Sequence, residues 1–155
     1  MKSIHTRRTF LATSAGGVAL SLMPSFSLAE ENEKTAPVRT ITHGPKHHWY
    51  GYYDKRAFDP TNRYVLSNEL DFEHRTPRAD DLIRVGMVDT QDGDKWTELG
   101  QSSAWGWQQG CMLQWRPMSD SEIVWNDRED GRYICRVLDT KTKKTRTLPR
   151  PIYTL

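Results

Sequence analysis

The sequence "AFDPTNRYVLSNE" at residues 57–69 has a second, divergent copy, "QWRPMSDSEIVWND", at residues 114–127. Pro60 aligns with Pro117 at an offset of 57, and Val65 aligns with Ile123 at an offset of 58. In each copy a turn sequence with proline leads into a run of β-branched and aromatic residues, which is typical of a strand. The chain is therefore predicted to repeat one strand-forming unit.

Two further matches follow in the same order along the chain. "IRVGMVDT" at 83–90 matches "YICRVLDT" at 133–140 at an offset of 50, and Leu99 matches Leu148 at an offset of 49. The offset falls because the loop between the second and third strands is longer in the first unit. A four-stranded unit that recurs after about 50 residues is the sequence pattern of a propeller blade. A β-sandwich is also built from short strands at similar spacing, and it stays open as the alternative.

The mature chain lacks helical periodicity, and its short apolar runs alternate with turn sequences. We expect strands at 51–58, 64–68, 83–89, 96–99, 109–115, 122–125, 133–139 and 145–148. The predicted fold class is all-β, a β-propeller of four-stranded antiparallel blades with only about two blades in this chain. Blade one would span about 43–101, blade two about 102–149, and a third would start at 150–155. Because a propeller normally has four to eight blades, closure would need missing blades or self-association.

Residues 1–29 have the features of an export signal. Basic residues precede a weakly apolar run rich in Gly, Ala and Ser, and small residues stand at 27 and 29, where a signal peptidase reads. The adjacent Arg7 and Arg8 resemble a twin-arginine signal. We expect cleavage after Ala29, a flexible leader at 30–42 and a periplasmic or secreted bacterial protein without a membrane segment. An uncleaved anchor at 10–28 is the alternative.

The charge of the mature chain argues against a nucleic-acid partner. The signal holds three of the 22 basic residues and none of the 20 acidic ones, which leaves a net charge of about −1 and no basic face. Cys111 and Cys135 each lie in an apolar run of an exported protein, so buried free thiols and a disulfide both stay open.

The polar residues that could form a site lie in loops predicted to share one rim. In a propeller, the loops that enter each innermost strand lie on the same rim as those that join the second and third strands. Polar and aromatic groups that converge at such a mouth are typical of a small-ligand or glycan site. The candidate binding residues are His47, Tyr52, Asp54, Trp105, Trp107, Gln108, Gln109 and Asp127, and the candidate catalytic residues are His48, Tyr53, His74, Arg75 and Arg128.

Several of these residues also have plain structural interpretations. Adjacent histidines on a strand point to opposite faces, so His47 and His48 are not expected to share a metal. Trp105 and Trp107 could stack on a sugar ring or could cover the top of the core. His74 could be an ordinary solvated histidine of a long loop.

Three segments resemble known propellers. "FDPTNRYVL" resembles the turn-and-strand signature of TolB-like propellers, while "HHWYGYYDK" and "WGWQQGCMLQW" resemble exported bacterial propellers related to the oligogalacturonate lyases. The resemblance covers residues 43–155. It implies either a polysaccharide lyase that acts on anionic oligo- or polysaccharides by β-elimination, or a non-catalytic propeller that binds protein or glycan.

In such a lyase, Arg75 or Arg128 would hold the uronate carboxylate, and His48, His74 or Tyr53 would serve as base and acid. No segment matches the metal-binding histidines of the lyases, so we expect no metal ligand and no cofactor in this part of the chain.

Overall fold

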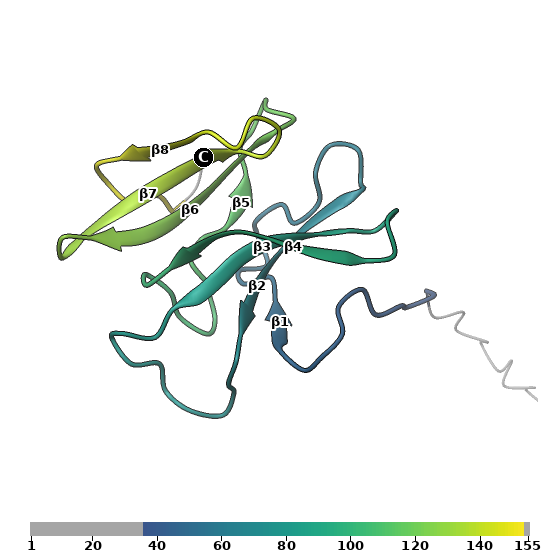
Figure 1. The fold of residues 1–155 in the computed structure, drawn as a ribbon, viewed down its shortest axis with the longest axis horizontal. Helices are drawn as coiled ribbons and strands as arrows, with labels where there is room; N and C mark the ends of the chain where they lie inside the picture. Colours follow the sequence, from purple (N-terminus) through teal and green to yellow (C-terminus); the bar gives the residue numbers. More distant parts are fainter. Residues whose placement is uncertain (1–35, 154–155) are drawn as a thin grey trace, which may run out of the picture. The chain divides into compact units, whose positions relative to one another are not determined.

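The computed structural model describes residues 36–153, and they form two four-stranded sheets (Figure 1). The first sheet has the order β1 (His47–Trp49), β2 (Tyr64–Leu70), β3 (Ile83–Asp89) and β4 (Lys95–Ser102). The second has the order β5 (Gln114–Trp115), β6 (Glu122–Glu129), β7 (Arg132–Asp139) and β8 (Thr145–Leu148). All neighbouring strands are antiparallel, and neither sheet closes on itself. The predicted all-β class and the two groups of four strands are confirmed.

Residues 36–153 contain no helix, and so none that is long and apolar enough to cross a membrane. The predicted signal at 1–29, the first part of the leader and residues 154–155 lie outside the described part of the chain.

The sequence repeat is also a repeat of strand register. Val65 pairs with Val88 in the first sheet, and Ile123 pairs with Leu138 in the second, so both offsets of the repeat are kept. The proline turns are equivalent as well, because the Asp59 amide donates to the Tyr64 carbonyl at 2.9 Å and the Arg116 amide donates to the Glu122 carbonyl at 2.9 Å.

The predicted first strand at 51–58 is wrong. The strand that pairs with the end of β2 is β1, and the chain then leaves the ladder at residues 50–56. Gly51 has a φ of 115°, which turns the chain out of an extended conformation. The chain returns where the Leu66 amide donates to the Ala57 carbonyl at 2.9 Å. Aromatic composition favoured a strand here, but the backbone conformation did not allow a continuous one.

The fifth strand is shorter than predicted for a similar reason. Gly110 and Met112 have φ values of 56° and 60°, so regular pairing is limited to Gln114 and Trp115. One further backbone contact precedes β5, where the Asn126 amide donates to the Cys111 carbonyl at 2.7 Å.

The two sheets share one apolar core. The first sheet contributes Leu66, Leu70, Ile83 and Val85, and the second contributes Leu113, Trp115, Ile123, Trp125 and Leu138. Trp125 reaches across to β4, where its Nε1 donates to the Gln101 carbonyl at 3.0 Å. Gly100 leaves the space for its ring, because a Cβ there would lie 2.7 Å from Trp125.

Both cysteines are buried free thiols, so they form no disulfide. Burial raises the pKa of Cys111 to about 12, which makes it an unreactive core residue rather than a nucleophile.

Candidate functional site

Two loops of the predicted rim lie against each other. The Trp107 Nε1 donates to the Arg75 carbonyl at 2.9 Å, and the Trp105 Nε1 donates to the Asp81 carbonyl at 2.8 Å. The loop after β2 is thereby attached to the loop after β4. These contacts bring the loop of His74 and Arg75 and the tryptophan loop side by side.

The tryptophans belong to an aromatic cluster that closes this end of the core. Trp105 and Trp107 have ring centroids 5.4 Å apart in an edge-to-face arrangement, and Trp49 and Phe72 contact both. Trp105 packs on the main core, and covering the core is one of the two roles that the sequence left open for it. Trp107 remains 37% exposed, and its ring is the most exposed of the four.

Trp107 separates two open hollows, which we together call the Trp107 site. One hollow, of about 670 Å³, is lined by Trp107 and by Glu73, His74, Arg75, Thr76 and Pro77. The other, of about 460 Å³, has Trp105, Trp107, Gln108, Gln109, Arg128 and Tyr133 in its lining. Seven of the thirteen residues predicted for a site therefore line these hollows.

The charge of Arg75 is neutralised within its own loop. Its Nη1 and Nη2 donate to the two carboxylate oxygens of Asp81 at 2.6 and 2.8 Å. These bonds, with one from the Arg78 amide, lower the pKa of Asp81 to about 2. Arg75 therefore stabilises the loop, and its charge is already balanced by the Asp81 carboxylate.

His74 and His47 flank Glu73 at the edge of the first hollow. The His47 Nδ1 lies 3.1 Å from one Glu73 oxygen, and the His74 Nε2 lies 3.6 Å from the other. The His74 side chain is 95% exposed, so it is a solvated group at the mouth of the hollow rather than an enclosed base.

Arg128 is the cation that faces the second hollow. Its guanidinium lies over the Tyr133 ring at 5.0 Å, and its Nη2 donates to the Tyr133 hydroxyl at 3.3 Å. The Arg128 Nε is buried without a hydrogen-bond partner among residues 36–153. Within the same range no carboxylate lies at ion-pair distance from Arg128, which leaves its charge available to a ligand.

Asp127 does not face either hollow. It accepts from the Ser103 amide at 3.1 Å and from the Arg136 Nε at 3.3 Å, so its two oxygens connect the second sheet to the tryptophan loop. The structure thus gives it a structural role beside the site.

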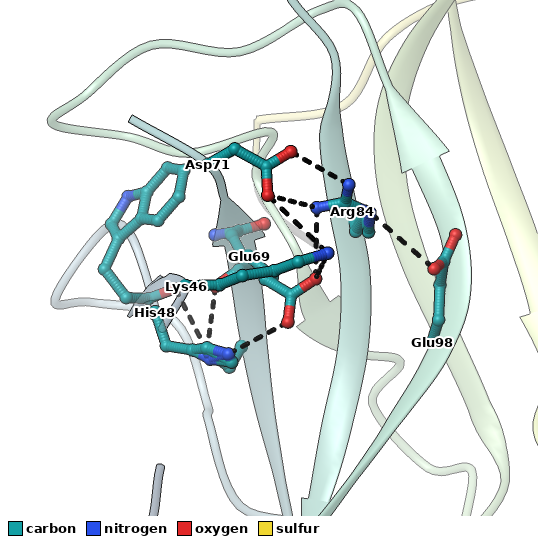
Figure 2. A network of polar contacts seen from close by, with 9 residues as sticks. Lys46, His48, Glu69, Asp71, Arg84 and Glu98 are labelled. Carbon is teal, nitrogen blue, oxygen red and sulfur yellow. Dashed lines mark hydrogen bonds and ion pairs between the residues drawn. The ribbon is translucent and has the colours of Figure 1, made fainter. Parts of the chain in front are cut away.

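His48 points to the other face of the first sheet, as the alternation predicted for adjacent histidines requires. Figure 2 shows it with Glu69, its direct partner across the strands, whose carboxylate lies 3.1 Å from the His48 Nε2. Glu69 also accepts from the Lys46 Nζ at 3.2 Å and from the Arg84 Nη1 at 3.1 Å. We call this group, with the Arg84 partners Asp71 and Glu98, the Glu69 network. His48 does not take part in the Trp107 site.

The environment of His48 favours its neutral form. Burial lowers its pKa, and the neighbouring Glu69 carboxylate opposes that shift only in part. The ring packs 4.9 Å from the Trp96 ring, and its Nδ1 is buried with no partner among the described residues. A histidine enclosed in this way acts as a packed structural residue.

Tyr52, Tyr53 and Asp54 form a separate cluster on the segment that leaves the first sheet. The Tyr52 and Tyr53 rings lie 4.7 Å apart, and Asp54 pairs with the buried Lys55 at 2.9 Å. Asp54 lines a different hollow, whose other walls include the Pro60 and Pro117 turns. These three predicted residues therefore do not join the Trp107 site.

Glu69, Arg84 and Tyr133 were not predicted from the sequence as site residues. A signal for the first two was present in the repeat, because Glu69 and Asp71 align with Asp127 and Glu129 at an offset of 58. In the second sheet Arg136 binds both of those carboxylates, at 3.3 and 3.1 Å, as Arg84 binds Glu69 and Asp71 in the first. Each sheet thus carries an arginine between two acidic residues.

Within residues 36–153, no three His, Cys, Asp or Glu side chains are grouped so that they could hold a metal ion. Comparison with protein-family models, curated proteins and solved structures returned no significant match.

Proposed function

We propose that the chain is part of an exported β-propeller, similar to TolB-like and oligogalacturonate-lyase-like proteins, and that it binds an anionic oligosaccharide at the Trp107 site. Two consecutive antiparallel sheets with the same strand order and register support the propeller interpretation. Each blade of such a fold is one sheet of this kind, packed against the next blade along the chain.

The accessible ring of Trp107 between two hollows is the observation that carries the binding proposal. Its Nε1 is already bonded to the Arg75 carbonyl, so the ring offers an apolar surface to the C–H groups of a sugar. The amides of Gln108 and Gln109 can pair with hydroxyl groups, and the unpaired Arg128 favours a uronate carboxylate. An aromatic surface with a few polar groups is the usual composition of such a site.

Binding is better supported than β-elimination. Elimination needs a cation, a base and an acid around one sugar residue. His48 lies on the opposite face of its sheet, Tyr53 lies in another cluster, and Arg75 is paired with Asp81. Only His74 and Arg128 remain near the site, and Trp107 stands between them.

Isothermal titration calorimetry with oligogalacturonate and with a neutral oligosaccharide of equal length tests the proposal. We expect the uronate to bind more tightly, and Trp107→Ala to weaken binding about tenfold, which corresponds to about 1.4 kcal/mol. Arg128→Gln should remove most of the preference for the uronate. Tyr53→Ala removes an exposed aromatic side chain outside the site and should leave the affinity unchanged.

The binding proposal fails if neither saccharide binds, or if Trp107→Ala binds as tightly as the unaltered protein. An increase in ultraviolet absorbance from unsaturated uronates during the titration would instead favour a lyase.

A further inference from the structure

Two asparagines occupy the same position in the two sheets. Asn68 and Asn126 differ by the repeat offset of 58, and both are buried on β2 and β6. The Asn68 Nδ2 donates to the Tyr50 carbonyl at 2.7 Å, and its Oδ1 accepts from the Cys111 thiol at 3.5 Å. Asn68 of the first sheet therefore contacts the chain where it enters the second sheet.

Asn126 makes the corresponding contact with the chain that leaves β8. Its Nδ2 donates to the Ile152 carbonyl at 2.7 Å, and its Oδ1 accepts from the Ile152 amide at 2.8 Å. Two bonds to the backbone of one residue hold that residue extended, as a neighbouring strand would. Ile152 thus approaches Asn126 as the Cys111 thiol approaches Asn68, although Asn68 donates its own amide to Tyr50.

The face of the second sheet around Asn126 repeats a face that is covered in the first sheet. Val124, Cys135 and Val137 align with Leu66, Val85 and Met87 at the repeat offsets of 58 and 50. The first-sheet residues pack into the core shared with the second sheet, whereas Val124, Cys135 and Val137 form a separate small core with Ile152.

At the edges of this small core, apolar side chains remain exposed. Tyr133 is 55% exposed and Leu148 is 36% exposed. Both share the face of Cys135, because Tyr133 lies two residues before it and Leu148 is its partner across the strands.

We propose that this face, which we call the Val124 face, receives a third four-stranded sheet of the same repeat, which the chain enters at Ile152. The inference rests on the propeller part of the proposed function and not on saccharide binding, although Tyr133 belongs both to this face and to the second hollow. It continues the existing interface, since the same asparagine and the same apolar positions would be used again. The third sheet would present large apolar side chains at positions equivalent to Trp115 and Ile123.

The position equivalent to Trp125 must carry a smaller side chain in that sheet. Trp125 fits against Gly100, which pairs with Val85. In the first sheet a bulge after Val85 skips Leu99, the sequence match of Leu148, and places Gly100 opposite Val85. The second sheet has no such bulge, so Leu148 stands opposite Cys135. A side chain docking there would meet a leucine in place of a glycine.

In a second copy of this chain, the outer face of the first sheet does not match the Val124 face. The outer face of the first sheet has Ser67 where the second sheet has Trp125, and it carries the Glu69 network with Arg84 beside it. Pressing the small apolar core onto these charges would remove part of their hydration without new partners. The geometry therefore favours a further sheet over the first sheet of a second copy.

The experiment replaces residues 153–155 with a second copy of residues 111–153, joined directly to Ile152. The appended copy carries Trp125→Val, which makes room for Leu148. Leu148→Cys in the original sheet reports on coverage through its rate of alkylation, since Cys111 and Cys135 are buried. Met118→Cys, at a fully exposed position, is the control for general reactivity.

We expect the extension to slow alkylation of Leu148→Cys at least tenfold and to leave Met118→Cys unchanged. Placing Ile123→Asp in the appended copy should restore the fast rate, because a charge on the facing surface prevents docking. Equal rates with and without the extension would overturn the proposal. So would protection of Leu148→Cys in the unextended chain together with a dimer in sedimentation velocity, because a second copy would then cover the face. Loss of saccharide binding in Trp107→Ala is measured separately and does not affect this result.

Discussion

Glu69→Ala should strongly destabilise the protein, because it removes the acceptor shared by three cationic or titratable groups. The Glu69 side chain is 8% exposed and lies within 3.1–3.2 Å of His48, Lys46 and Arg84. A hydrogen bond to a charged group contributes about 1.5–3 kcal/mol, and removing one member of a buried ion pair costs about 3–5 kcal/mol.

Part of this loss is recovered in the variant. Arg84 keeps its bond to Asp71 at 2.9 Å, and Lys46 lies 3.6 Å from Asp71 and is partly solvated. We therefore expect the free energy of unfolding to fall by roughly 2–3 kcal/mol, the lower part of those ranges. Most of this decrease in the free energy of unfolding comes from His48, because its side chain is enclosed and has no other partner among residues 36–153.

Urea unfolding followed by tryptophan fluorescence measures this change. For a domain of this size the expected loss shifts the midpoint by roughly 1–2 M, with an m-value of about 1.5 kcal/mol/M. Glu98→Ala is the matched control, because Glu98 is 46% exposed and 3.9 Å from Arg84, so its loss should be below about 0.5 kcal/mol. If the two variants unfold at the same urea concentration, the Glu69 network does not stabilise the fold as argued.

Three further predictions concern protonation and packing. Burial lowers the pKa of His48, so the unfolded state binds the proton more readily, and the free energy of unfolding should fall as the pH drops below about 6.5. In His48→Gln, the urea midpoint should therefore change less between pH 8 and pH 5 than it does in the unaltered protein. The pKa of Asp81 is lowered to about 2, so its contribution to the free energy of unfolding should persist down to about pH 4 and disappear towards pH 2. At neutral pH, Asp81→Asn should speed proteolysis of the 71–82 loop several-fold, and an unchanged cleavage rate would contradict the role given to Arg75. Gly100→Ala should lower the free energy of unfolding by about 1–3 kcal/mol through its contact with Trp125, whereas Gly106→Ala, with no atom within 4 Å of the added Cβ, should change it little; calorimetric melting compares the two.

The strand pattern could be predicted well wherever pairing agrees with local composition. The strands around Val65, Val88, Ile123 and Leu138 were found because β-branched residues alternate there between turn sequences. The first strand was misplaced because "GYYDK" has strand composition while Gly51 adopts a positive φ. Local propensity does not report such a departure, which is decided by the pairing of β1 with β2.

The candidate site was predictable only in part. The loop positions of His74, Arg75 and Trp107 followed from the order of strands, and the structure brings these loops together. The pairing of Arg75 with Asp81 was not predicted, although it decides that the charge of Arg75 is already balanced within its own loop. Arg128 remains available because no acidic side chain of the described residues folds onto it.

The sequence by itself determined the all-β class, the twofold repeat of four strands and the opposite directions of His47 and His48. These features depend on short-range periodicity, on turn residues and on the alternation of side chains along a strand. Only the tertiary structure decided that His48 meets Glu69, that Asp127 is bound to Arg136 and that Trp107 keeps an open ring. Each of these depends on contacts between segments distant in the chain, and strand register and loop packing select those contacts from many that composition alone allows.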